Sequence, residues 1–200
     1  MKRIFISFLL FFLISFFLQV KSFSYSTDPE KFIAEIVDEA KIILNSSDSK
    51  EEKAEKLSII ALNTVDIKGI GYYTLGKKRK EISPEKLKNY EELFEKYFLK
   101  SFTSRLTDYS DPKISVLSAE KVNEKYTIVK TMLLKTDKKP EVKINWRVYT
   151  KNPDNPLIRD LIIEGLSLAR TQKEEFASVI ESNNGDVTKL FATLKDFTNK

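Results

Sequence analysis

The chain of 200 residues contains no cysteine and no histidine, and each absence removes whole classes of function. Without cysteine there is no disulfide, no thiolate zinc site, no cysteine nucleophile and no lipid-modified cysteine anchor. Without histidine, the commonest general base, the usual serine triad and imidazole metal ligands are missing. The sequence therefore points away from most extracellular hydrolase mechanisms, and it predicts neither a metal site nor a cofactor.

The first 24 residues contain no acidic side chain, and their pattern is typical of a secretory signal peptide. Lys2 and Arg3 precede an apolar run over residues 4–18, and Ser22-Phe23-Ser24 offers small residues for cleavage. The run of about 15 residues is shorter than the ~20 that a membrane-spanning helix needs. We therefore expect an exported protein whose residues 25–200 form a single domain. An uncleaved N-terminal anchor is the alternative.

Charge is nearly balanced once these 24 residues are set aside. The chain has 34 Lys and Arg against 29 Asp and Glu, and three of the basic residues precede residue 25, which leaves 31 against 29. Nucleic-acid binding needs a concentrated basic face, so we expect no nucleic-acid partner. The one dense basic run, residues 77–80, is interpreted either as a solvated turn or as a patch facing anionic lipid headgroups.

Apolar residues recur at helical spacing through the N-terminal half. The pattern and its start signals predict helices over residues 28–45, 50–63, 65–76 and 84–109. The last of these carries an aromatic stripe that includes Tyr90, Phe94, Tyr97 and Phe98. We interpret the stripe either as core packing or as the wall of a cavity.

After residue 112 the period changes to two, which is typical of strands. We predict four strands over residues 114–119, 126–135, 142–149 and 157–164. Their connections are short and polar, which favours an antiparallel meander. A capping box at residues 171–174 and a cap at Asp186 predict two final helices. The order of elements predicts an α+β domain with a four-stranded antiparallel sheet, and with helices before and after the sheet in the chain.

Two further patterns bear on catalysis. Asp160 and Glu164 share one face of the last predicted strand, and we interpret them either as structural hydrogen-bonding groups or as the carboxylate pair of a hydrolase. Gly69-Ile70-Gly71 lacks the preceding strand and the third glycine of a nucleotide-binding loop, so we discard that function.

Several motifs occur together in an order and spacing that resemble the MlaC family, also called the toluene-tolerance family. Asp160–Ser167, with its Glu-Gly-x-Ser end, is the most specific of them. The others are Val65-Asp66, Leu75-Gly76, Ser83-Pro84-Glu85, Phe94, Tyr97, Trp146–Tyr149 and Phe176–Ile180.

The resemblance implies a soluble periplasmic carrier of the Mla lipid-asymmetry system. Such a carrier holds phospholipid acyl tails in an apolar cavity between a twisted antiparallel sheet and helices, and it leaves the headgroup exposed. It is not an enzyme. The implied partners are a phospholipid ligand, an inner-membrane ABC transporter complex and an outer-membrane lipoprotein complex. The remaining alternatives are a secreted non-catalytic binding or assembly module with an ordinary core, and the carboxylate-dependent hydrolase.

The resemblance also implies a set of lipid-binding residues. Positions that match the family are Leu75, Phe94, Tyr97, Trp146 and Val148. Periodicity alone extends this wall to Tyr73, Phe98, Met132, Leu134 and Ile162. The chain departs from the family pattern at Lys78 and Arg79, where the family often has aromatic residues, and this leaves room for a charge near the headgroup.

Overall fold

Helices precede and follow a single antiparallel sheet in the computed structural model, which describes residues 25–108, 111–135 and 140–199. The predicted signal peptide lies outside these residues. The helices are α2 (Pro29–Asn45), α3 (Lys50–Thr64), α4 (Ile67–Leu75), the 3-10 helix η1 (Gly76–Lys80), α5 (Pro84–Leu106), α6 (Leu168–Glu181) and α7 (Val187–Asn199). The strands are β1 (Ile114–Asn123), β2 (Tyr126–Leu133), β3 (Val142–Tyr149), β4 (Leu157–Ile163) and β5 (Leu166–Ser167).

Side-chain caps start the N-terminal helices where the sequence predicted. The Asp28 carboxylate accepts a hydrogen bond from the Lys31 amide at 3.0 Å, one residue before α2 begins. Ser49 and Glu52 form both hydrogen bonds of a capping box at the start of α3. Ser83 caps α5, with Pro84 in the first turn. Each cap satisfies amides that the helix itself leaves unpaired.

The sheet has five strands in the order β1-β2-β3-β4-β5, so the prediction of four strands is wrong by one short strand. Glu164 and Gly165 have φ angles of 48° and 85°, and they form the two-residue turn that leads from β4 into β5. Positive φ at both central residues is what a type I′ hairpin turn requires. The expected strand over residues 157–164 therefore ends at Ile163, and the chain returns to pair with it.

Strand β1 runs to Asn123, four residues beyond the predicted end. Its pairing with β2 shifts register between Val116 and Ser118 and again between Lys121 and Asn123. Each shift breaks the alternation of side chains between the two faces. Residues 117–123 are exposed, so the pattern of apolar residues does not reveal that they continue the strand.

Helix α6 begins at Leu168, so the start predicted from the Thr171–Glu174 capping box is wrong. Ser167 is the N-cap, and its hydroxyl accepts from the Arg170 amide at 3.1 Å. The carboxylate of Asp160 accepts from the Ala169 amide at 3.0 Å. The helix is thus capped at Ser167, four residues before Thr171, and the Thr171 hydroxyl instead donates to the Ser167 carbonyl within the helix.

The basic run at residues 77–80 belongs to the 3-10 helix η1, where Lys77, Arg79 and Lys80 are exposed to solvent. Gly76 ends α4 with a φ of 60°, a conformation that glycine adopts without steric cost. The chain then winds directly into η1, so the predicted third helix ends near its expected place but is extended by a second, tighter element.

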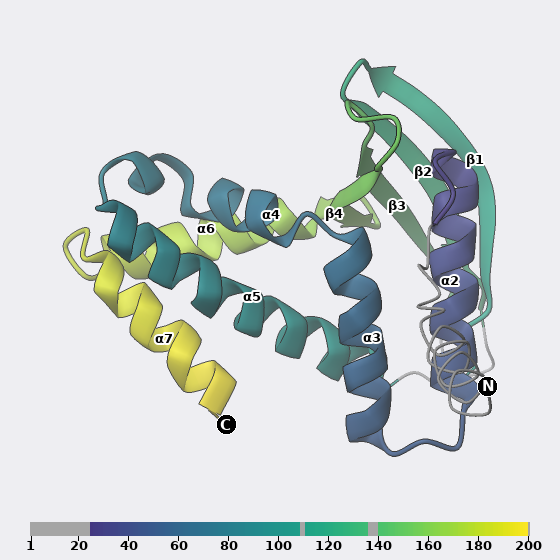
Figure 1. The fold of residues 1–200 in the computed structure, drawn as a ribbon, viewed down its shortest axis with the longest axis horizontal. Helices are drawn as coiled ribbons and strands as arrows, with labels where there is room; N and C mark the ends of the chain where they lie inside the picture. Colours follow the sequence, from purple (N-terminus) through teal and green to yellow (C-terminus); the bar gives the residue numbers. More distant parts are fainter. Residues whose placement is uncertain (1–24, 109–110, 136–139, 200) are drawn as a thin grey trace, which may run out of the picture.

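Two apolar cores hold the molecule together, and Figure 1 shows the two groups of elements that form them. One lies between α2, α3 and one face of the sheet, and it includes Val129, Val148 and Ile158. The other lies among α4, α5, α6 and α7. Val65, between α3 and α4, packs against both, and it forms a β-bridge with Ile158. The sheet and the C-terminal helices are therefore joined through the α3–α4 junction.

Part of the aromatic stripe on α5 is core packing. Tyr90 is fully buried, and its ring stacks on Phe191 of α7 with centroids 5.7 Å apart. Its hydroxyl donates to the Gly71 carbonyl at 3.2 Å and lies 2.9 Å from the Thr74 hydroxyl. Burial raises the pKa of the Tyr90 phenol above its ordinary range. These contacts fix α5 against α4 and α7.

Gly71 is where α4 approaches α5 most closely, and replacing it by alanine is expected to lower the free energy of unfolding by about 1–3 kcal/mol. A Cβ at this position would lie 2.8 Å from the ring of Phe94, which is itself buried. Chemical denaturation of Gly71→Ala measures the effect.

The double variant Gly71→Ala, Phe94→Leu is the control, because the smaller side chain removes the ring that causes the clash. In the Phe94→Leu background, Gly71→Ala is expected to lower the free energy of unfolding by less than half as much as it does in the natural chain. An equal cost in both backgrounds would show that the ring contact does not explain the glycine.

Candidate functional site

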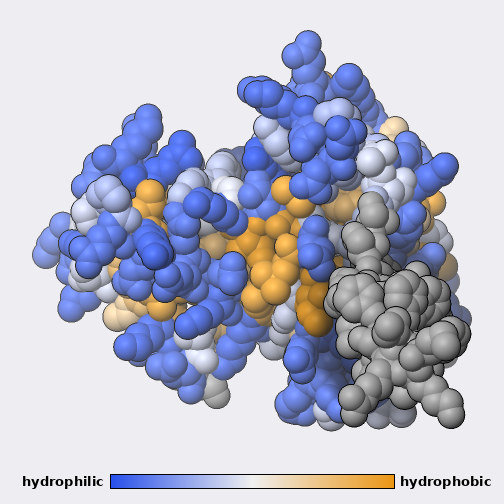
Figure 2. All heavy atoms as spheres, in the orientation of Figure 1, coloured by the Kyte–Doolittle hydropathy of each residue, from blue (hydrophilic) through white to orange (hydrophobic). Residues whose placement is uncertain are grey.

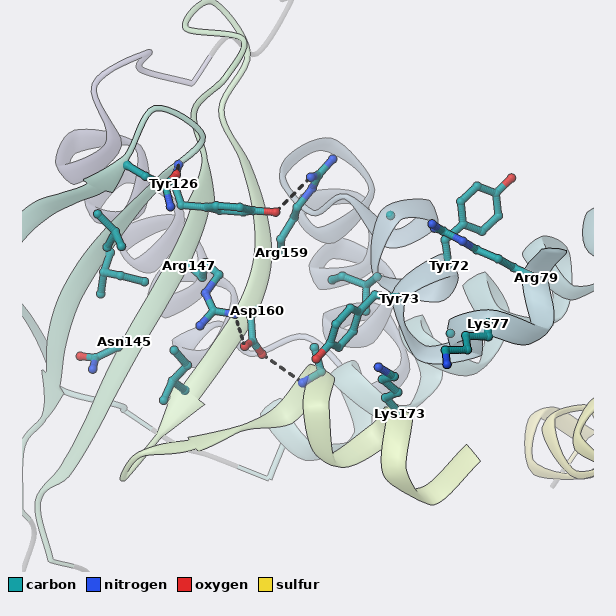
Figure 3. Close-up of a pocket in the computed structure, with 18 of the residues that line it drawn as sticks. Tyr72, Tyr73, Lys77, Arg79, Tyr126, Asn145, Arg147, Arg159, Asp160 and Lys173 are labelled. Atoms are coloured by element: carbon teal, nitrogen blue, oxygen red, sulfur yellow. Dashed lines mark hydrogen bonds and ion pairs between the residues drawn. The ribbon is translucent and has the colours of Figure 1, made fainter. Parts of the chain in front are cut away.

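A cleft of about 940 Å³ opens between the sheet and the helices, on the sheet face opposite α2 (Figure 3). Strands β2, β3 and β4 and the β1–β2 hairpin line one side, and α4, η1 and the start of α6 line the other. This volume is at the upper end of the range of about 300–1,000 Å³ that small-molecule sites occupy. The cleft can hold a ligand larger than a typical metabolite.

The apolar part of the cleft lining, which we call its floor, is interrupted on the sheet by Arg147 and Asn145 of β3. Ile128 of β2 and Ile162 of β4 point into it, and Ile70 of α4 and Ala169 of α6 meet them from the helix side. Side chains alternate between faces along a strand, so Ile128 lies opposite its neighbour Val129, which is buried in the core under α2. Both faces of the sheet are thus partly apolar, one against a core and one against the cleft.

Basic side chains dominate the rest of the lining. Six line the cleft, against one acid, Asp160. The basic residues are Lys77, Arg79 and Lys80 of η1, Arg147 of β3, Arg159 of β4 and Lys173 of α6. We call Lys77, Arg79, Lys80 and Lys173 the cationic rim. The cleft therefore combines an apolar floor with a cationic rim, and such a site is complementary to a ligand that has an apolar part and a negatively charged end.

Arg159 connects the sheet to the helix side of the cleft. Its guanidinium lies 2.6 Å from the Asp66 carboxylate, which also caps α4 by accepting from the Gly69 amide at 2.9 Å. The same guanidinium stacks 3.5 Å from the ring centroid of Tyr149 and donates to the Tyr126 hydroxyl at 3.3 Å. A Cβ on Gly69 would lie 2.3 Å from the Asp66 carboxylate, so this contact explains the first glycine of the Gly-Ile-Gly run.

Asp160 is buried, at 4% exposure, between β4 and the start of α6. Its carboxylate accepts from the Ser167 hydroxyl at 2.6 Å and from the Ala169 amide at 3.0 Å. A guanidinium nitrogen of Arg147, on the neighbouring strand β3, lies 3.4 Å from the same carboxylate. These contacts occupy both carboxylate oxygens, and they fasten α6 to the sheet (Figure 3).

Glu164 does not share a strand face with Asp160, so that expectation is wrong. It lies in the β4–β5 turn with a φ of 48°, where it is exposed and accepts from the Lys143 amide. It is not part of the cleft lining. A carboxylate pair facing a common substrate is therefore not formed by these two residues.

The sequence-predicted lipid-binding residues lie in three places. Tyr73 and Ile162 line the cleft. Four others belong to the helical core or pack against it, namely Leu75, Phe94, Tyr97 and Phe98. The remaining four are on the sheet side: Met132 on β2, Leu134 just beyond its end, and Trp146 and Val148 on β3.

Trp146 and Val148 lie on the sheet face that packs under α2, opposite the cleft. Val148 is fully buried there, and the Trp146 indole donates to the Thr131 hydroxyl at 3.0 Å. Leu134 is 40% exposed. The cleft lining includes two of the ten residues, and lipid contact at each of the ten stays a prediction.

The sequence singled out the basic run at residues 77–80 as a possible headgroup patch, but it did not connect Lys173 with it. Helices η1 and α6 are separated by more than 85 residues and meet only in the folded chain. A further signal for part of the cationic rim was the departure from the family pattern at residues 78–79. Lys78, however, points elsewhere and pairs with Glu81 at 2.7 Å.

A second apolar surface is visible outside the cleft. Figure 2 shows apolar side chains gathered in the middle of the face in view, where α3 lies beside α5. Helix α3 carries two largely exposed apolar side chains, Ile59 at 54% and Leu62 at 49% exposure.

The described residues offer neither a cluster of metal ligands nor a membrane-spanning helix. Across residues 25–108, 111–135 and 140–199, acidic side chains do not gather in the groups of three or more that would hold a metal ion. Every helix in these ranges is too short or too polar to cross a bilayer.

Comparison with known proteins gives a consistent result. A sequence model described as MlaC protein matches residues 34–196. Among solved structures, the fold is similar to that of a phospholipid-binding protein from Ralstonia solanacearum, which was solved in complex with a phospholipid. The TM-score is 0.70 at 18% identity, over 84% of this chain and 94% of that one. No curated protein sequence matches the chain. On the extent of the family match, this chain belongs to the MlaC family.

Proposed function

We propose that this protein binds one phospholipid and carries it through the periplasm between the outer and inner membranes. The acyl tails lie on the apolar floor of the cleft, and the headgroup stays at the cationic rim, open to water. The proposal includes export by the N-terminal signal peptide and no catalytic step.

The observation that carries the proposal is the polarity of the cleft. Ile128 and Ile162 form its floor, and basic side chains surround its opening. Membership of the MlaC family and the fold shared with a phospholipid-bound protein support the same ligand class. Asp160, the one acid in the lining, is engaged with Ser167, Ala169 and Arg147. This engagement favours a structural role over a catalytic one.

The physics of lipid transfer requires such a cleft. Each buried CH₂ group is worth about 0.8 kcal/mol, so exposing two 16-carbon tails to water costs on the order of 20 kcal/mol. An enclosing apolar surface offsets this cost without any catalytic group. The two partners in the proposal, between which the lipid passes, are an outer-membrane lipoprotein complex and an inner-membrane ABC transporter complex.

Lipid carried by the purified protein tests the proposal. The full chain, with its leader, is produced in a Gram-negative host and purified from the periplasmic fraction without detergent. Lipid extraction followed by mass spectrometry and phosphorus analysis is expected to give about one phospholipid per protein. An unrelated periplasmic protein of similar size, purified in parallel, is expected to carry none.

Protein that arrives empty and does not load from phospholipid vesicles would refute lipid binding. Protein that is retained in the cytoplasmic fraction with its leader uncleaved would refute the proposed compartment. Lipid that is recovered as cleaved fatty acid would indicate a hydrolase instead of a carrier.

A further inference from the structure

The net charge of this protein is concentrated in the cleft. Residues 25–200 have 31 basic and 29 acidic side chains, a net charge of about +2. The cleft lining alone has six basic side chains and one acid. The residues outside the cleft therefore carry a net negative charge, so the positive field of the molecule is focused at this one opening.

Two of the six basic side chains are engaged with acids and four are not. Arg159 pairs with Asp66 at 2.6 Å, and Arg147 lies 3.4 Å from Asp160. Among the described residues, no carboxylate lies within 4.0 Å of a charged nitrogen of the cationic rim. The neighbouring Lys78, which does not line the cleft, is by contrast paired with Glu81. The charges that face the opening are those left available for a ligand.

The fold builds the rim from two elements. Because a 3-10 helix has about three residues per turn, Lys77 and Lys80 lie on the same side of η1. Helix α6 runs beside this segment, since a Cβ on Gly76 would lie 3.4 Å from the Lys173 side chain. The Lys173 ammonium is 5.0 Å from the ring centroid of Tyr73, a cation–π contact that holds it at the cleft.

The apolar floor and these charges line the same opening. Figure 3 shows Lys77, Lys173 and Tyr73 on the helix side and Arg147 and Asn145 on the sheet side of the same opening. A ligand whose tails rest on Ile128 and Ile162 would therefore bring its polar end to the rim. A zwitterionic headgroup offers the rim a phosphate and an ammonium that oppose each other, whereas an anionic headgroup offers net negative charge only.

We propose that the cationic rim makes this carrier selective for phospholipids with a net negative headgroup over zwitterionic ones. This inference rests on the proposed function, because it concerns the headgroup of the lipid held in the cleft. The group that the rim would recognise is a lipid phosphate that has no ammonium group beside it. The rim charges are exposed or half-exposed, so the selectivity falls as salt is added.

Competitive loading tests the proposal. Delipidated protein is incubated with vesicles of equal parts phosphatidylglycerol and phosphatidylcholine of identical chains, and the bound lipid is quantified by mass spectrometry. We expect about a tenfold enrichment of phosphatidylglycerol at low salt, falling several-fold in 0.5 M salt. In the rim variant, the ratio of the two bound lipids is expected to fall below about 2. Its four substitutions are Lys77→Gln, Arg79→Gln, Lys80→Gln and Lys173→Gln.

A matched variant removes the same charge away from the cleft and is expected to keep the natural ratio. Its substitutions, all at exposed positions on α2, α5 and α7, are Lys31→Gln, Lys96→Gln, Lys189→Gln and Lys195→Gln. Equal loading of both lipids by the natural protein would overturn the selectivity and leave lipid binding intact. Failure to load either lipid would instead overturn the proposed function.

Inorganic phosphate distinguishes a headgroup from a free anion. At 10 mM phosphate, with ionic strength matched by chloride, phosphatidylglycerol loading is expected to be unchanged. Phosphate that binds the protein in calorimetry and displaces phosphatidylglycerol would overturn the headgroup assignment in favour of a free-anion site. A ratio that falls equally in the rim variant and in the matched variant would show that net charge, not the rim, sets the preference.

Discussion

Replacement of Asp160 by alanine is expected to lower the free energy of unfolding by about 3 kcal/mol. The carboxylate is 4% exposed, and its removal leaves the Ser167 hydroxyl and the Ala169 amide without their acceptor. It also leaves Arg147 without its nearby acid. A buried polar group without a partner costs about 1–3 kcal/mol, and breaking a buried ion pair about 3–5 kcal/mol. Because the Arg147 side chain is 42% exposed, water replaces part of its interaction with Asp160, and the ion pair contributes less than a fully buried pair would. Urea denaturation measures the loss.

Glu174→Gln on α6, the helix that Asp160 fastens to the sheet, is the control. Glu174 pairs with Arg170 at 3.0 Å, but both side chains are largely exposed, so the change is expected to stay within about 0.5 kcal/mol. Asp160→Asn keeps one acceptor and is expected to lie between the two. If Asp160→Asn abolished lipid release or transfer while stability stayed unchanged, the structural role assigned to this carboxylate would be contradicted.

A carboxylate placed on the cleft floor is expected to reduce lipid occupancy at least tenfold. In Ile128→Asp or Ile162→Asp, the bound acyl tails would have to cover a charged group, and burial of a charge costs several kcal/mol unless it is paired. The larger loss is expected for Ile162→Asp, because Ile162 pairs with the uncharged Asn145, whereas Ile128 pairs with Arg147. Both residues are only half-buried in the folded protein, so the fold itself is expected to tolerate the change better than the lipid complex does. Occupancy is measured as phospholipid per protein after purification.

Two variants control for the charge and for the position. Leu117→Asp introduces the same group on β1, at a site that is 57% exposed and outside the cleft, and it is expected to keep full occupancy. Ile128→Val keeps the floor apolar and is expected to do the same. Normal occupancy in both aspartate variants would place the acyl tails somewhere other than this floor.

Local signals in the sequence were sufficient for most of the fold. Strand β3 has its predicted bounds, and Asp28, Ser49 and Ser83 start their helices as expected. Each of these depends on residues close together in the chain, where periodicity and capping chemistry apply directly.

The errors arise where a tertiary contact overrides a local pattern. The Thr171 capping box is a good local start, but Asp160 from β4 supplies an acceptor to the Ala169 amide, and α6 begins earlier. The register shifts in β1 place exposed residues in a strand that its alternation does not reveal. The β4–β5 turn depends on positive φ at Glu164, which few non-glycine residues adopt.

The site was harder to predict than the fold, because it is assembled from distant segments. Tyr73 and Ile162 were selected by periodicity and line the cleft, whereas Phe98 was selected by the same reasoning and packs against the helical core. Periodicity identifies a buried face but does not say whether another element or a ligand covers it. Local patterns also do not explain Gly69 and Gly71. A side chain at these positions would clash with the Asp66 carboxylate and the Phe94 ring, and these contacts form only in the folded protein.

A crystal structure of the protein with its co-purified lipid is the most direct test of the account. We predict acyl carbons in contact with Ile128 and Ile162, and a headgroup phosphate among Lys77, Arg79, Lys80 and Lys173. A lipid seated on the opposite face of the sheet, against Trp146 and Val148, with the cleft filled only by solvent, would contradict it.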